Sequence, residues 1–226
     1  MISDGDFVAV GLSGGKDSMA LVHLLSKLKK YATAKFDLCA ISINPGFERV
    51  GGSSSLDFQK AKDFCESLDV PLHIVETDIA EVVFEIRNEK NPCSLCANMR
   101  RGALATTMNR HGINKLALGH HQDDLIATFL MNLIYGGKIK GLEPVSFLDK
   151  KEITVIRPLI YTREKTIIQY CERNDIPVIK SPCPIDKKTA RQDVTEIARH
   201  LYSINEHAES AIINAVRSLI EKKEES

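Results

Sequence analysis

The amino-acid sequence predicts an α/β fold: a doubly wound, parallel five-stranded sheet with helices on both faces, followed by C-terminal helices. Two observations predict it. Short runs of β-forming residues alternate with amphipathic runs at helical spacing, which is typical of βαβ units. After the fifth β-rich run only helical patterns follow. A length of 226 residues suits one domain. We therefore expect a single domain over residues 1–226, with the last ~40 residues as a helical appendage.

The predicted strands are short apolar runs bounded by turn residues. The first ends in a glycine-rich turn, and the sequence N-P-G at residues 44–46 breaks the second. Ligands of parallel sheets bind at the carboxyl ends of the strands, so a site is expected in the loops after the first, second and fourth strands. The predicted strands cover residues 7–12, 36–43, 72–75, 115–118 and 153–156.

The predicted helices place apolar residues three and four positions apart. In the first helix Leu21, Leu24 and Leu28 share a face, and the third helix is expected to stop at Gly112, a normal residue for a helix C-terminus. The predicted helices cover residues 16–30, 54–69, 95–111, a segment around 126–133, 163–174, 188–204 and 208–222.

Composition and charge exclude several classes of protein. Hydrophobic residues make up 43% and charged residues 27%, as in ordinary globular proteins. Lys and Arg number 30, as do Asp and Glu, whereas a dedicated nucleic-acid binder is usually basic. No signal peptide is visible, and the longest apolar window, Leu125–Tyr135, is too short to span a membrane. We expect a cytoplasmic protein with no membrane partner, whose six cysteines are reduced.

The sequence S-G-G-K-D-S at residues 13–18 predicts an anion-binding loop between the first strand and the first helix. It is not a Walker loop, because Val10 stands where the first glycine is needed and Asp17 where a serine or threonine is needed. Gly14 and Gly15 let backbone N–H groups approach a phosphate, and the helix N-terminus adds its positive dipole. Asp17 would repel a bare phosphate, which predicts Mg²⁺ between them. The structural alternative is a tight turn in which Asp17 only complements the helix dipole.

A second motif places Cys93 and Cys96 at C-x-x-C spacing at the start of a predicted helix, so both thiolates can reach one metal centre. The spacing alone leaves three interpretations open: a redox dithiol, a zinc site and part of an iron–sulfur cluster. Cys183 lies between two prolines in a segment that cannot be helical, and a cysteine presented there is a candidate ligand. The remaining cysteines fall on strand or helix faces expected in the core: Cys39, Cys65 and Cys171.

The sequence L-G-H-H-Q-D-D falls at the end of the fourth predicted strand, on the ligand-binding edge of the sheet. We expect His120 near the α-phosphate or adenosine of a nucleotide, and Asp123 or Asp124 in proton transfer or metal positioning. The alternative is that the acids stabilise the first helical turn, while a histidine caps the helix or packs in the core. Arg100 follows Cys96 by one helical turn, so it either faces the same cavity or belongs to a solvated basic face.

Five motifs occur in a fixed order: S-G-G-K-D-S, C-S-L-C-x-x-x-R-R-G, L-G-H-H-x-D-D, I-R-P-L and a late isolated cysteine before R-Q. In this order they resemble the tRNA 2-thiocytidine synthetase family of the PP-loop ATP pyrophosphatase superfamily, over roughly residues 5–200. The resemblance implies the PP-loop fold, which is adenine nucleotide alpha hydrolase-like, with a loop that holds the pyrophosphate end of ATP. It also implies a tRNA substrate and a homodimer, and it leaves the sulfur donor open.

The chemistry that the resemblance implies is thiolation. A pyrimidine carbonyl oxygen is adenylated with release of pyrophosphate, and sulfur held by the open iron of a 4Fe–4S cluster then replaces that oxygen with loss of AMP. The expected cofactors are the cluster, ATP and Mg²⁺. Either Asp123 or Asp124 is expected to serve in proton transfer or metal positioning. The expected site residues are the cluster ligands Cys93, Cys96 and Cys183, the catalytic residues Arg100, Asp123 and Asp124, the Mg²⁺ ligand Asp17, and the ATP-binding residues Ser13, Gly14, Gly15, Lys16, Asp17, Ser18, Ile43, Gly119 and His120.

Three other functions stay open at this point. The first is an ATP-dependent PP-loop ligase with an amine nucleophile, which would have no use for three converging cysteines. The second is a non-catalytic ATP-binding regulator, against which Asp17 and the pair Asp123 and Asp124 argue. The third is a cysteine-pair redox protein, which would need neither Cys183 nor the S-G-G-K-D-S loop. Related synthetases usually carry an extension before the first strand, whereas Met1 stands close to it here. The alternatives to a tRNA bound by this chain alone are another nucleobase, a free small molecule, or a tRNA held with a partner's help.

Overall fold

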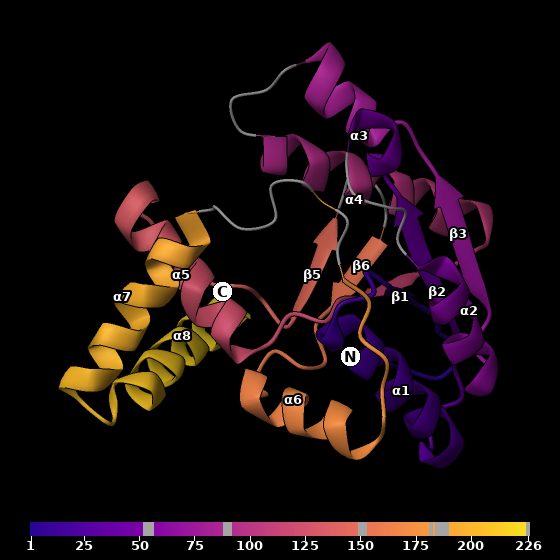
Figure 1. Ribbon diagram of the computed structural model, residues 1–226. Helices are drawn as coiled ribbons and strands as arrows, with labels where there is room; N and C mark the ends of the chain where they lie inside the picture. Colours follow the sequence, from indigo (N-terminus) through magenta and orange to yellow (C-terminus); the bar gives the residue numbers. More distant parts are fainter. Residues whose placement is uncertain (52–56, 88–91, 149–152, 181–182, 184–189, 225–226) are drawn as a thin grey trace.

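The protein contains a six-stranded sheet with helices on both sides (Figure 1). The strand order is β3-β2-β1-β4-β6-β5. Parallel pairing runs from β3 through β2, β1 and β4 to β6. The strands are β1 (Phe7–Gly11), β2 (Asp37–Asn44), β3 (Leu72–Glu76), β4 (Lys115–Ala117), β5 (Val145–Leu148) and β6 (Ile153–Ile156). The computed structural model describes residues 1–51, 57–87, 92–148, 153–180, 183 and 190–224.

The α/β fold is confirmed, but the expected number of five strands is wrong. β5 adds a sixth, antiparallel edge strand, in which Val145 pairs with Ile156 and Leu148 with Ile153. Its four residues alternate between exposed and half-buried, and Phe147 is exposed. Because so short a strand with one exposed face carries little apolar signal, the sequence pattern did not reveal it.

The two faces of the sheet bury different residues of the central strand, as expected of a doubly wound sheet. Val8 and Val10 pack with residues of α1 (Lys16–Tyr31), α2 (Phe58–Ser67) and α6 (Glu164–Arg173). Ala9, between them, packs on the other face with α4 (Pro92–Arg110). All three side chains are fully buried, which is typical of a parallel strand covered on both sides.

The predicted helices are present, with shifts at their ends. α4 begins at Pro92, before the expected residue 95, because proline suits the first turn of a helix. α2 begins after Asp57, whose carboxylate accepts a hydrogen bond from the Lys60 N–H at 3.0 Å. The expected starts at residues 54 and 188 lie outside the described residues. Three short turns were not predicted: η1 (Phe47–Val50), α3 (Ile79–Glu81) and the π-helical η2 (Val82–Ile86).

The C-terminal helices pack on α5, on the side of the molecule away from β3 (Figure 1). The C-terminal helices are α7 (Ala190–Ile204) and α8 (Ala208–Glu224), and α5 covers Gln122–Gly136. Leu125 and Ile126 of α5 share a core cluster with Val194 of α7 and Val216 of α8. α7 therefore stands beside the start of α5, where the carboxyl end of β4 delivers the chain. Within the described parts of the chain, none of the helices combines the length and apolar character needed to cross a membrane.

Candidate functional site

The loop between β1 and α1 is shaped by its own hydroxyl groups. Gly14 has a φ of +84°, which residues with a side chain rarely adopt, and Gly15 is the N-cap of α1. The Ser18 hydroxyl donates to the Gly15 carbonyl at 2.9 Å and accepts from the Ser13 N–H at 3.2 Å. Ser18 is buried, so its hydroxyl holds the loop in shape. The first N–H groups of α1 have no partner inside the helix and are suited to bind an anion.

Lys16 connects this loop to α6. Its ammonium lies 3.1 Å from Oδ2 of Asp17 and 2.7 Å from Oε1 of Glu164. Burial alone lowers the pKa of Lys16, but the two carboxylates outweigh burial and raise it. The Cys171 thiol of α6 also donates to the Lys16 carbonyl, with sulfur and oxygen 3.6 Å apart. Contacts from α6 thus hold both the backbone and the charged end of Lys16.

His121 stands among three carboxylates. Its Nε2 lies 3.8 Å from Oδ1 of Asp17 and 3.5 Å from Oδ2 of Asp124, and its Nδ1 lies 3.5 Å from Oδ2 of Asp123. Burial alone lowers the pKa of His121, but the carboxylates of Asp123, Asp124 and Asp17 outweigh burial and raise it. The neighbouring His121 imidazole in turn lowers the pKa of Asp123. This arrangement can hold a proton on the imidazole between acidic groups.

Sequence reasoning selected His120 and missed its neighbour. His121 is the N-cap of α5, and its backbone N–H donates to Oδ2 of Asp124 at 3.1 Å. In the described part of the chain, His121 is among the residues that line the cavity described below and His120 is not. The signal that could have identified His121 is its place directly before Q-D-D, because an N-cap faces the same helix end as the first-turn acids.

The segment after β4 meets the loop backbone to backbone. A Cβ atom on Gly119 would lie 2.9 Å from the carbonyl carbon of Asp17 and 3.1 Å from the Ser18 nitrogen. The glycine is therefore required for this close approach. On the other side, Oδ2 of Asp123 accepts the Glu164 N–H at 2.9 Å. The starts of α1, α5 and α6 therefore meet at one point. Of these, α1 and α5 follow the first and fourth predicted strands, after which the sequence predicts a site.

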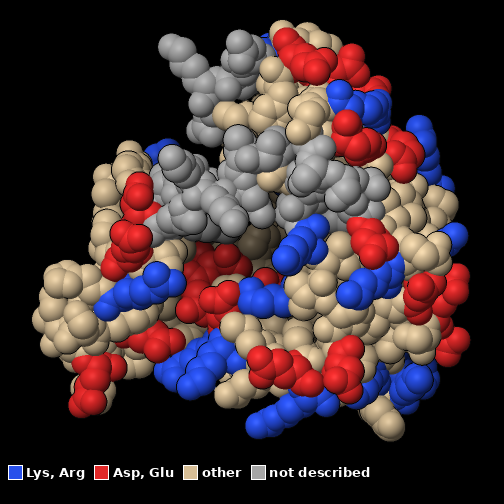
Figure 2. All heavy atoms as spheres, in the orientation of Figure 1, with Lys and Arg blue, Asp and Glu red and all other residues tan. Residues whose placement is uncertain are grey.

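A cavity of about 400 Å³ opens between these helix starts and α7. This volume lies within the range of small-molecule sites. Figure 2 shows acidic side chains gathered beside a hollow at the centre of this face. The charged or titratable groups that line the cavity, apart from a tyrosine, are the carboxylates of Asp17, Asp123, Asp124 and Glu164 and the nitrogen groups of Lys16, His121 and Arg199.

Two of the candidate cluster ligands, Cys93 and Cys183, both lie within electrostatic reach of the third, Cys96. Cys93 and Cys96 are in the first turns of α4, where Cys93 is exposed and Cys96 half-buried, and Cys183 is also half-buried. Burial raises the pKa of Cys96, the Arg100 guanidinium opposes the rise, and the Cys183 and Cys93 thiolates add to it. Among the described residues, no three His, Cys, Asp or Glu side chains are arranged to hold a single metal ion.

The other three cysteines are core residues, as expected. Burial raises the pKa of Cys39 to about 12 and that of Cys65 to about 11. Burial also raises the pKa of Cys171. All three are buried, and their raised pKa values disfavour the thiolate, so they are poor ligands and poor nucleophiles.

Arg100 points into the protein and not along a solvated face. Its guanidinium carbon lies 5.7 Å from the centre of the Phe47 ring, and its Nε is buried with no hydrogen-bond partner in the described structure. The next residue, Arg101, is exposed and bonds to its own helix, through Asn98 at 2.6 Å. Arg100 therefore stands beside Cys96, on the inner side of α4.

Two further segments reach the edge of the sheet near the loop. Ile43, the residue before the last of strand β2, is partly buried against the core of the α4 face. The Ile179 N–H donates to the Gly14 carbonyl at 2.9 Å, shortly before the chain arrives at Cys183. Ile179, which precedes the third cysteine in the sequence, is thus bonded to the phosphate loop.

The sequence matches the PP-loop domain family over residues 3–208. It is 41% identical over 202 residues to the tRNA-cytidine(32) 2-sulfurtransferase of Aliivibrio fischeri (strain MJ11), covering 87% of this chain and 63% of that protein. The tRNA-cytidine(32) 2-sulfurtransferase of Pelobacter propionicus (strain DSM 2379 / NBRC 103807 / OttBd1) is 36% identical over 222 residues, covering 97% of this chain and 80% of that protein. The chain thus spans a little less than two thirds of the length of the Aliivibrio relative.

Solved structures agree with these matches. The U34-tRNA thiolase NcsA from Methanococcus maripaludis, determined with its 4Fe–4S cluster, is similar with a TM-score of 0.78 and 29% identity, covering 97% of this chain and 73% of that one. The NH3-dependent NAD synthetase from Campylobacter jejuni subsp. jejuni NCTC 11168 shares the fold alone, with a TM-score of 0.51 and 16% identity over 96% of this chain and 86% of its own. The chain belongs to the PP-loop domain family, in the group of the tRNA-cytidine(32) 2-sulfurtransferases.

Proposed function

We propose that the chain is an ATP-dependent, 4Fe–4S cluster-dependent sulfur transferase that thiolates a pyrimidine of tRNA. One observation carries the proposal: the charges of Cys93 and Cys183 both act on Cys96, and Ile179, which precedes Cys183 in the sequence, bonds to the PP-loop at Gly14. A phosphate-binding loop and a three-thiol group so connected suit a reaction that needs both ATP and bound sulfur. The names of the sequence relatives favour cytidine as the base.

The donor set fits an iron–sulfur cluster. Thiolates are the ligands that such clusters take, and each cysteine binds a different iron, so the three need not converge on one point. Cys93, Cys96 and Cys183 would hold the cluster, since the other cysteines are buried in the core. When bound, the cluster supplies an iron position without a protein ligand, where a sulfur atom can be held.

Asp17 suits a magnesium ion. Its Oδ1 is buried and has no hydrogen-bond donor within the described structure, while Oδ2 contacts Lys16. A carboxylate oxygen placed in this way beside an anion-binding loop is a ligand that Mg²⁺ prefers, and the ion would also bind the phosphates. We therefore propose that Asp17 holds Mg²⁺ together with ATP.

The protein's own groups have distinct tasks in this reaction. The N–H groups at the start of α1, with Lys16, bind and orient the pyrophosphate end of ATP. The base carbonyl oxygen then attacks the α-phosphate. His121 Nδ1 and Asp123 Oδ2 lie 3.5 Å apart, and this pair can hold a proton close to the place where the base oxygen would react. Arg100 lies on α4 beside Cys96, which is a proposed cluster ligand, so it would face the sulfur that the cluster holds. The same proposal includes ATP binding by Ile43, Gly119 and His120. It also includes Asp124 as the alternative to Asp123 in proton transfer or metal positioning.

The cellular location, the domain organisation and the oligomeric state are also part of the proposal. Accessible thiols that bind a cluster suit the reducing cytoplasm, which we propose as the location. We also propose that residues 1–226 act as one domain and that the protein is a homodimer. The last helices would belong to that domain, because α7 and α8 share a core with α5.

The test begins with metal analysis. The protein is purified without oxygen and reconstituted with iron and sulfide, and iron, zinc and acid-labile sulfide are measured per chain. We expect about four irons with matching sulfide. Cys183→Ser should lose them, whereas Cys65→Ala, a core control on α2, should keep them. Thiolation of unmodified tRNA with ATP should then release AMP and pyrophosphate.

Other outcomes would contradict the proposal. Zinc without sulfide, or no metal at all, would remove the cluster. An enzyme that stays active after Cys93→Ser would be the ligase with an amine nucleophile. A protein that binds ATP but releases no pyrophosphate with any RNA would be the non-catalytic regulator.

A further inference from the structure

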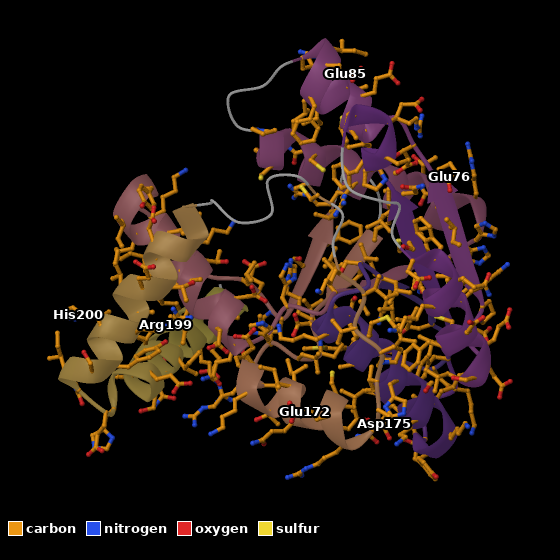
Figure 3. All side chains as sticks on the ribbon, in the orientation of Figure 1. Glu76, Glu85, Glu172, Asp175, Arg199 and His200 are labelled. Carbon is orange, nitrogen blue, oxygen red and sulfur yellow. The ribbon has the colours of Figure 1, made fainter. Side chains whose placement is uncertain are left out.

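The cavity wall opposite the phosphate loop is formed by one face of α7. Val194 and Ala198 pack this helix on α5, so the fold itself fixes the wall. Arg199 and the next residue, His200, lie on different sides of the helix (Figure 3). The spacing of the wall residues is that of a single helical face. They are Thr195, Ala198, Arg199 and Tyr202.

The nitrogen groups of the cavity are not equally engaged. Lys16 already contacts Asp17 and Glu164, and His121 is surrounded by carboxylates. Arg199 is exposed, and the described ion pairs do not include it. A guanidinium in this state offers several N–H donors in a planar fork. The cavity therefore presents an arginine across from its anion-binding loop.

We propose that Arg199 binds the pyrophosphate end of ATP from the side opposite the PP-loop. This inference rests on the proposed use of ATP. When the base oxygen bonds to the α-phosphorus, the bond from that phosphorus to the oxygen that bridges to the β-phosphate breaks. The electron pair stays on the departing pyrophosphate, which gains negative charge. A guanidinium fork matches phosphate oxygens in geometry and charge, so Arg199 stabilises both the bound triphosphate and the leaving group.

Binding measurements on the full chain test this without requiring turnover. Magnesium pyrophosphate and AMP are titrated calorimetrically into the wild type, Arg199→Ala and Arg199→Lys. Loss of charged hydrogen bonds should weaken pyrophosphate binding about tenfold or more in Arg199→Ala. Arg199→Lys should restore part of it, because the charge remains and the fork does not. AMP lacks the β- and γ-phosphates, so its affinity should stay unchanged in both variants.

Arg173→Ala, an exposed arginine in the last turn of α6, is the matched control and should bind both ligands as the wild type does. Wild-type affinity of Arg199→Ala for pyrophosphate would overturn the inference, and a loss confined to tRNA binding would assign the arginine to an RNA phosphate. An equal loss of AMP and pyrophosphate affinity would also overturn it, because that result indicates a distorted site. A chain that binds pyrophosphate through Arg199 but holds no cluster would refute only the sulfur-transferase proposal.

Discussion

Gly119→Ala tests the close contact between the β4–α5 segment and the phosphate loop. The new Cβ would lie 2.9 Å from the carbonyl carbon of Asp17 and 3.0 Å from its oxygen, both backbone atoms. Non-bonded carbons prefer about 3.5 Å or more, so the two backbones must separate by roughly 0.6 Å. Inserting a methyl group into such a contact costs about 1–3 kcal/mol of unfolding free energy. The same shift moves Asp17 away from His121, so we expect activity to fall by about tenfold or more.

Urea unfolding and pyrophosphate release from ATP in the presence of tRNA measure the two effects. Gly136→Ala is the control, because its Cβ would meet only Cγ of Lys138 at 4.0 Å. That change in the last turn of α5 should leave activity intact and alter stability by less than about 1 kcal/mol. A Gly119→Ala protein with the wild-type urea midpoint and wild-type pyrophosphate release would refute the reasoning, since the contact would then yield at no cost.

Three further variants probe the charges. The pKa of His121 is raised above its ordinary 6.5, so protonated His121 stabilises the fold below that pH, and the contribution disappears as the pH rises through the folded value. Urea midpoints measured against pH should show this loss in the wild type and not in His121→Asn, and parallel curves would contradict it. Glu164→Gln frees Lys16 from an ion pair of 2.7 Å, so calorimetry should show ATP binding severalfold tighter, and an unchanged Kd would mean that solvent already screens the pair. Asp6→Asn removes the carboxylate charge that Lys115 contacts at 2.6 Å and should lower the unfolding free energy by about 1–3 kcal/mol at neutral pH. Because the pKa of Asp6 is lowered, urea midpoints of the two proteins should converge as the pH falls through the folded value, below 3.8, and a constant gap would contradict the assignment.

The main sheet was predictable because its strands and helices carry regular patterns. Val8, Ala9 and Val10 form a continuous apolar run, as expected of a strand covered on both faces. β5 lacked that signal, since Val145 and Phe147 remain exposed and the strand exists only by pairing with β6. Tertiary pairing decided this element, and a single sequence does not show which edge is available.

The site was predictable where a motif is contiguous and less so where it depends on packing. The loop and the histidine–aspartate segment follow strands whose carboxyl ends meet, so their approach followed from topology. Which of His120 and His121 enters the cavity depends on the N-cap geometry of α5. Arg199 had no local signal at all, because its place in the cavity follows from the packing of Val194 on α5.

The peptide at Gly14 joins the two halves of the proposed chemistry. Gly14 has a positive φ directly before the N-cap of α1, and its carbonyl accepts the Ile179 N–H at 2.9 Å. Ile179 is buried, so this bond is protected from water and is costly to break. The chain then continues to Cys183. A ligand that moves the loop must therefore either move Ile179 as well or break a buried hydrogen bond. In the proposed reaction this one contact would link the ATP site to the part of the chain that precedes Cys183.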